Sequence, residues 1–248
     1  MSDYGKLVLA DLTKWQKKMG KSPSIVNRVS KNLQVRINRI IPEKVHRVIT
    51  TAIKHMTRTM LSGAAFTTSK PLIGVDLYTR EAEVKRTIKF YRNTSTAEGA
   101  ITGAAGILLG LADFPIWLTL KMKMLSEIAA LYGYSVDDFK ERLYILHIFQ
   151  LTFSSQAHRR KIFFLLERWE EYKNELPNNM NEFDWRNFQQ EYRDYIDLAK
   201  LLQLVPGIGA AVGAYVNHRL TEKLGYNAMQ AYRMRVDSAV LKSIGSGS

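Results

Sequence analysis

Residues 99–120 form a long apolar run whose only ionisable side chain is that of Asp113. The glycines of this run recur every three or four residues, at Gly99, Gly103, Gly106 and Gly110. On a helix this spacing gathers them on one face, and a face of small residues lets a neighbouring helix approach closely. Pro115 disfavours α geometry at the residue before it and suits the first turn of a new helix. We therefore expect a helical hairpin with its corner at Asp113.

A second glycine-rich apolar segment, residues 204–214, again joins a proline to glycines four residues apart. We expect a second hairpin, in which Gly209 and Gly213 support close helix packing. Asn217 lies about one helical turn after Gly213. Its amide is expected either to pack between helices or to hydrogen-bond a neighbouring backbone.

The first apolar run is also close to the length of one transmembrane helix. Asp113 and Pro115 lie near its far end, and Lys121 and Lys123 follow soon after, which argues against a stable span. We favour close packing inside a soluble core. Shallow or reversible insertion into a bilayer and a stable span remain the alternatives.

Apolar residues recur at helical spacing through the other long segments, and no segment shows the two-residue alternation of a strand. Helices are expected over residues 76–91, 161–173, 181–204 and 226–242. Another is expected to begin with Ser135-Val136-Asp137-Asp138, whose acidic residues suit the first turn of a helix. A turn is expected at residues 93–96, and Gly133 suits a left-handed helix stop. The predicted fold class is all-α, a single multi-helix bundle with two glycine-rich apolar helical hairpins.

Three parts of the chain differ in composition. Residues 1–60 are expected to form basic amphipathic helices, and residues 61–242 a helical domain. The small residues of 243–248 indicate a flexible tail or a cloning remnant. The N-terminus lacks the pattern of a signal peptide, so we expect a cytoplasmic protein.

The positive charge of the chain is concentrated near its N-terminus. Residues 1–60 hold 13 Lys or Arg against 3 Asp or Glu, which is +10 of the formal charge of +13. Such a segment attracts polyanions, either the anionic face of a membrane or nucleic acid, although a solvated helix face remains an equally open interpretation. For membrane binding we single out a set of basic residues with one aromatic: Lys14, Trp15, Lys17, Lys18, Lys21, Arg28, Lys31, Arg36 and Arg39.

The sequence excludes several kinds of site. There is no cysteine, and the histidines His46, His55, His147, His158 and His218 show no metal-ligand spacing. No phosphate-binding loop and no nucleophile elbow is present. We therefore predict neither a metal nor a cofactor.

Two carboxylates are candidates for catalysis. Asp113 lies in an apolar run, where a charge needs a partner, a helix N-terminus or water, so it is expected either to cap the next helix or to serve a ligand or a proton. Glu141, beside Arg142 and the acidic cap, is expected either to join a polar site or to make surface ion pairs.

Two blocks of this sequence resemble the EcsC family of bacterial proteins. The first is residues 103–133, with the corner Ala112-Asp113-Phe114-Pro115, and the second is residues 205–214 with Asn217 after it. Glu141-Arg142 also resembles the family, and the similarity covers about residues 45–240, without the N-terminal segment. The family is named for a gene beside a bacterial ABC transporter. The resemblance implies a membrane-linked accessory role and transfers no reaction.

Our leading interpretation is a non-enzymatic accessory or scaffold protein that docks on the cytoplasmic face of the membrane through its basic helices. Its expected partner is anionic lipid, with a membrane protein as a further candidate, and its apolar interior is a candidate holder of a lipid chain or a partner helix. One alternative is a hydrolase or lipid-modifying enzyme with a site near Asp113. Another, which we rank last, is a nucleic-acid-binding protein, because no nucleic-acid motif is present.

Overall fold

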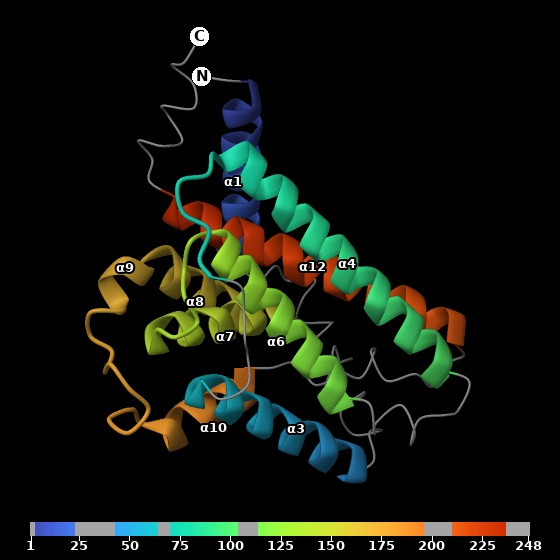
Figure 1. Cartoon of the computed structure of the whole chain (residues 1–248). Helices are drawn as coiled ribbons and strands as arrows, with labels where there is room; N and C mark the ends of the chain where they lie inside the picture. Colours follow the sequence, from blue (N-terminus) through green and yellow to red (C-terminus); the bar gives the residue numbers. More distant parts are fainter. Residues whose placement is uncertain (1–2, 23–42, 64–69, 104–113, 196–209, 237–248) are drawn as a thin grey trace.

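The computed structural model describes residues 3–22, 43–63, 70–103, 114–195 and 210–236 (Figure 1). Within these residues the fold is all-α, nine helices packed in one bundle, and there is no β-strand. The helices are α1 (Asp3–Gly20), α3 (Glu43–Ser62), α4 (Leu77–Gly103), α6 (Phe114–Leu131), α7 (Phe139–Phe153), α8 (Gln156–Glu167), α9 (Trp169–Tyr172), α10 (Trp185–Tyr195) and α12 (Ala210–Arg235). The predicted fold class is confirmed at this level.

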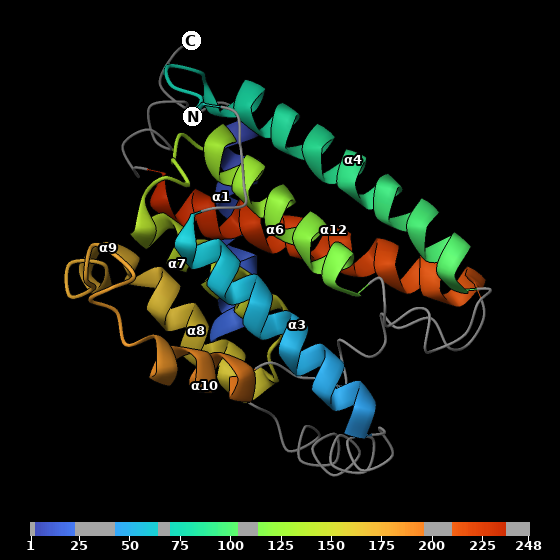
Figure 2. The same ribbon diagram turned by 60° about the horizontal axis from the view of Figure 1, so that its bottom comes forward.

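Two long helices, α4 and α12, run antiparallel along one side of the bundle, and α6 lies against both (Figures 1 and 2). Cross-contacts from Glu81 to Arg233 and from Arg92 to Glu222 fix this direction. α7 lies at the centre, with nearly every side chain buried. α3 packs on α6 and α7, and α1 packs on α8 and α12, so both N-terminal helices join the same bundle.

Local signals placed several helix ends correctly. α7 begins after Asp138, whose carboxylate accepts a hydrogen bond from the Lys140 backbone N–H. The chain leaves α6 through Gly133, which has a φ of 91°. α6 itself starts at Phe114, as expected of a helix with Pro115 in its first turn. Each of these signals acts within a few residues, and so it survives in the folded protein.

Other helix ends were predicted wrongly. No turn occurs at residues 93–96, because α4 continues to Gly103. The segment predicted as one helix over 161–173 is divided between α8 and α9, which meet at Arg168. α10 begins at Trp185, and α12 runs unbroken from Ala210 to Arg235, where a new helix was expected from residue 226. Polar turn formers are tolerated inside a helix when packing along its other face holds it.

Large parts of the two predicted glycine hairpins lie outside the described residues. The corner at Asp113, together with Gly106, Gly110 and Gly209, lies outside the described residues. Gly99 and Gly103 belong to α4, and Gly213 belongs to α12. None of the helices within the described residues has an apolar stretch long enough to cross a bilayer.

Among the described residues, Gly225 brings two helices into close contact. It was not one of the glycines predicted for close helix packing. A Cβ atom built on Gly225 of α12 would lie 2.6 Å from Cγ1 of Ile88 on α4, and 2.9 Å from both Cγ2 and Cδ1 of the same side chain. These distances leave no room for a methyl group unless Ile88 moves. The close contact of α4 with α12 therefore depends on the missing side chain at this position.

We expect Gly225→Ala to destabilise the protein by about 1–3 kcal/mol, because the new methyl group overpacks the contact with Ile88. In an Ile88→Ala background the same substitution should become neutral or stabilise by up to about 1 kcal/mol, since alanine favours helix over glycine. Urea unfolding of the wild type, both single variants and the double variant measures the difference. Equal effects of Gly225→Ala in the two backgrounds would contradict this account.

Candidate functional site

The C-terminal end of α12 carries two arginines that enter the interior of the bundle. The guanidinium of Arg233 donates from Nε and Nη2 to both carboxylate oxygens of Glu81, at 2.7 and 2.6 Å, and from Nη1 to Asp11 at 2.7 Å. Glu81 is fully buried and also accepts hydrogen bonds from the hydroxyls of Tyr4 and Tyr132. This first cluster joins α1, α4, the end of α6 and α12.

The second arginine, Arg235, forms a separate cluster with Glu141. Its Nη1 donates to a Glu141 oxygen at 2.7 Å, and its Nε donates to Glu170 at 3.1 Å. The hydroxyl of Tyr232 donates to the other Glu141 oxygen at 2.5 Å. The guanidinium also lies 3.7 Å from the ring centroid of Tyr134, so it has aromatic as well as carboxylate partners.

The electrostatics of the two clusters follow from burial and pairing. Burial raises the pKa of Glu141, and the charge and hydrogen bonds of Arg235 offset this only in part. Burial lowers the pKa of Arg233, but hydrogen bonding and charge from Glu81 raise it by more, so the net pKa lies above its ordinary value. Both oxygens of Glu141 are already occupied by protein donors. The geometry therefore suits a structural ion pair better than a general acid or base.

Glu141 is thus buried, at 2% exposure, and makes an interior ion pair where surface ion pairs were one expectation. Its neighbour Arg142 serves the backbone, since it donates to the carbonyl oxygens of Leu61, Val136 and Asp137. These bonds join the start of α7 to the end of α3. Whether Asp113 approaches Glu141 lies outside the described residues.

α1 presents a row of lysines to solvent. Lys14, Lys17 and Lys18 are exposed on the helix, and Lys21 is exposed just beyond its end. The opposite stripe of the helix is buried and consists of Val8, Leu12, Trp15 and Met19. The other predicted membrane-binding residues, Arg28, Lys31, Arg36 and Arg39, lie outside the described residues.

The expectation that Trp15 seats at a membrane interface is wrong for this structure. Trp15 is only 2% exposed, and its ring packs edge-on against Phe163 with centroids 5.6 Å apart. Its indole Nε1–H donates to Asn227 at 3.0 Å. The side chain anchors α1 to α8 and α12.

Asn217 of α12 lies between helices, which was one of the two expectations for this residue. Its side-chain oxygen accepts a hydrogen bond of 2.6 Å from the indole Nε1–H of Trp117 on α6, and the residue is buried. The donor of this hydrogen bond is a side chain. It replaces the solvation that the indole loses inside the bundle.

An apolar groove of about 730 Å³ lies between α3 and the start of α6. Its apolar lining consists of Val48, Ala52, Met56, Pro115 and Ile116. Its polar lining consists of Arg47, Thr51, His55 and Thr119. Cavities of this size and composition are typical of sites for small apolar ligands.

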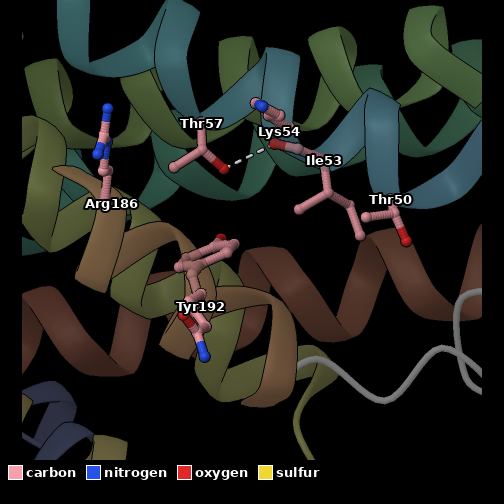
Figure 3. Close-up of a pocket in the computed structure, with 7 residues that line it drawn as sticks. Thr50, Ile53, Lys54, Thr57, Arg186 and Tyr192 are labelled. Atoms are coloured by element: carbon pink, nitrogen blue, oxygen red, sulfur yellow. Dashed lines mark hydrogen bonds between the residues drawn. The ribbon is translucent and has the colours of Figure 1, made fainter.

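A smaller hollow of about 290 Å³ lies on the other flank of α3, facing α10 (Figure 3). Lys54 enters it from α3 and Arg186 from α10, and neither has an ion-pair partner within the described part of the chain. The hydroxyls of its floor are engaged, since Thr57 donates to the Ile53 carbonyl and Tyr192 donates to the Leu146 carbonyl. The hollow is therefore positive, but both of its cations are exposed to water.

Sequence reasoning missed most of these residues. Glu81 had a detectable signal, because it occupies a position of the apolar stripe formed by Leu77, Val84, Ile88 and Tyr91. A charge on such a stripe indicates a buried partner. Arg47 and Ile116 offered no comparable signal. No group of histidine, aspartate or glutamate side chains among the described residues is arranged to hold a metal ion.

Comparison with known proteins gives one family. A sequence model described as the EcsC protein family matches residues 6–236. The chain is 40% identical over 232 residues to Protein EcsC of Bacillus subtilis (strain 168), which covers 93% of this chain and 95% of that protein. It is 34% identical over 146 residues to Uncharacterized protein YdbA of the same organism, covering 58% and 53% of the two chains. No solved structure matches.

The match begins at residue 6 and so includes α1. The N-terminal segment therefore belongs to the family match, contrary to the expectation that it lies outside the resemblance. The charge pattern of α1 differs from that of the remaining helices. The helix nevertheless supplies Asp11 and Tyr4 to the first arginine cluster.

We expect Glu141→Gln to lower the free energy of unfolding by about 3 kcal/mol, because Arg235 loses its buried charge partner. In a double-mutant cycle, Arg235→Met should cost less in the Glu141→Gln background than in the wild type. The exposed pair of Arg86 with Glu83 serves as a control, and Arg86→Met should cost less than about 1 kcal/mol. An unchanged stability of Glu141→Gln would show that the carboxylate is free for chemistry.

The buried imidazole of His147 generates a prediction on pH. Burial lowers its pKa to about 4, whereas the unfolded chain has the ordinary value of about 6.5. Between these values the unfolded chain binds a proton that the native ring does not, so stability falls as the pH drops from about 6.5 to 4. The loss amounts to about 3 kcal/mol at full extent.

His147→Phe should remove this part of the pH dependence. The measurement is urea unfolding at pH 7 and pH 4.5, with His55→Phe on the exposed face of α3 as a control that keeps the wild-type slope. An identical pH dependence in the wild type and in His147→Phe would refute the assignment.

Proposed function

The chain belongs to the EcsC protein family, and from this premise we propose that it is an accessory protein that docks on the cytoplasmic face of the membrane. The observation that carries the proposal is the row of exposed lysines on α1 and just beyond its end, namely Lys14, Lys17, Lys18 and Lys21. This row lies on a helix whose other face is fixed in the bundle by Trp15. The cations are thus presented on a rigid support rather than on a free chain.

The expected strength of docking follows from the charge. Each basic residue near an anionic membrane contributes about 1 kcal/mol, so the four lysines of α1 supply about 4 kcal/mol, which corresponds to millimolar affinity. If Arg28, Lys31, Arg36 and Arg39 contribute equally, the total reaches about 8 kcal/mol, which corresponds to micromolar affinity. We therefore propose that both sets act together and that docking is reversible and sensitive to salt.

The family supports the proposal beside the exposed lysines. As part of the proposal, the docked protein acts beside a transport or secretion system, with a membrane protein as a further partner. The interior ion pairs of Arg233 and Arg235 favour a scaffold over an enzyme, because the described carboxylates in both clusters are occupied by protein donors. No observation on the described residues specifically favours nucleic acid.

We expect the purified protein to co-sediment with vesicles that contain phosphatidylglycerol and not with purely phosphatidylcholine vesicles, and to be released by raised salt. Replacement of Lys14, Lys17, Lys18 and Lys21 by glutamate should abolish binding. Replacement of Arg28, Lys31, Arg36 and Arg39 should do the same if both sets are needed.

The matched control has four charge reversals on exposed residues of other surfaces, at Lys70, Lys89, Lys123 and Arg219. It changes the net charge equally and should keep most of the binding. If the control and the α1 variant lose vesicle binding equally, the loss is explained by net charge and not by the position of the α1 lysines. No binding of the wild type to any vesicle, or preference for a polynucleotide, would refute the proposal.

A further inference from the structure

The groove between α3 and α6 leaves apolar side chains open to solvent. Val48 of α3 is 39% exposed and Ile116 of α6 is 56% exposed, whereas Ala52 and Met56 beneath them are buried. Val48, Ala52 and Met56 follow one another every four residues, so they form a continuous stripe along the helix. Together they make an apolar channel with a closed floor and an open top.

The channel has a length set by helix geometry. From Arg47 to Met56 the axis of α3 rises about 14 Å, at about 1.5 Å per residue. A single extended hydrocarbon chain matches an apolar groove of this length. A groove volume of about 730 Å³ is ample for one such chain.

In the part of the rim that the structure describes, the groove carries positive charge and no negative charge. Among the described residues of its lining, Arg47 and His55 are the charged or titratable ones, and none is an aspartate or glutamate. Arg47 is exposed and has no ion-pair partner among the residues that the structure describes. The His55 ring lies 3.4 Å from the Thr59 hydroxyl, on its own helix. One guanidinium at one end of an apolar channel matches one carboxylate, which it can bind through two parallel hydrogen bonds.

We propose that this groove binds a free fatty acid, with the acyl chain along Val48, Ala52 and Met56 and the carboxylate at Arg47. The acyl chain covers the exposed surfaces of Val48 and Ile116. The fatty-acid carboxylate supplies the ion-pair partner that Arg47 lacks among the described residues. The smaller hollow beside Lys54 and Arg186 has less than half this volume, at about 290 Å³, and so suits such a chain less well.

This inference rests on the proposed membrane role for its biological setting. Binding of the fatty acid in the groove does not itself require membrane docking. α1 and α3 lie on opposite sides of α12, with α6 and α7 next to α3 (Figures 1 and 2). Vesicle docking by α1 and ligand binding by the groove can therefore be measured separately. The α1 variant that loses docking should bind the fatty acid as the wild type does.

The test is isothermal titration calorimetry of the full chain with dodecanoate below its micelle concentration. We expect binding to strengthen about tenfold from decanoate to dodecanoate, because two more methylenes leave water. Thr51→Trp places a large side chain in the groove from an exposed position and should weaken binding at least about tenfold. Thr13→Trp on the exposed face of α1 is the control for bulk and should bind as the wild type does.

Arg47→Glu tests the head group. It should weaken dodecanoate at least about tenfold and leave the uncharged dodecyl maltoside unchanged, whereas Arg58→Glu, on the exposed ridge outside the groove, should change neither. Circular dichroism and thermal unfolding confirm that each variant is folded. The proposal is overturned by absence of dodecanoate binding, by full binding in Thr51→Trp, or by binding of lauroyl lysophosphatidylglycerol alone.

Discussion

Two buried arginines at the end of α12 hold the bundle together. Arg233 contacts Glu81 and Asp11, and Arg235 contacts Glu141 and Glu170, so one short segment joins α1, α4, α7 and α9. A charge removed from water costs several kcal/mol unless its partners are well placed. Each arginine therefore fixes the position of several helices at once, because only this arrangement supplies its carboxylates.

The same constraint divides the molecule into an interior and a working surface. The polar groups of the two arginine clusters are committed to one another, and the rings of Tyr132 and Tyr232, stacked 5.2 Å apart, join the clusters. Such an interior tolerates little change and offers little freedom for catalysis. The features without internal partners lie outside, on the exposed face of α1 and in the groove between α3 and α6.

Residues of the candidate site were predicted correctly only where the pattern of nearby residues was sufficient. Glu141 was recognised as a polar candidate, but its burial was not foreseen, since its partner Arg235 lies 94 residues away. Trp15 was assigned to a membrane surface because it lies among lysines. The spacing of Val8, Leu12, Trp15 and Met19 already placed it on an apolar stripe, and the buried ring follows that stripe.

By itself the sequence determined the helical class, the stop at Gly133, an acidic helix start near residues 135–138 and the positive N-terminal segment, because each depends on residues within a few turns of one another. Only the tertiary structure decided which charges are buried and where a groove remains open. Arg233 and Glu81 are 152 residues apart, and Val48 meets the groove opposite Ile116 only after α3 packs on α6. Helical periodicity gives the face of each helix, whereas pairing between faces depends on the free energy of the whole bundle.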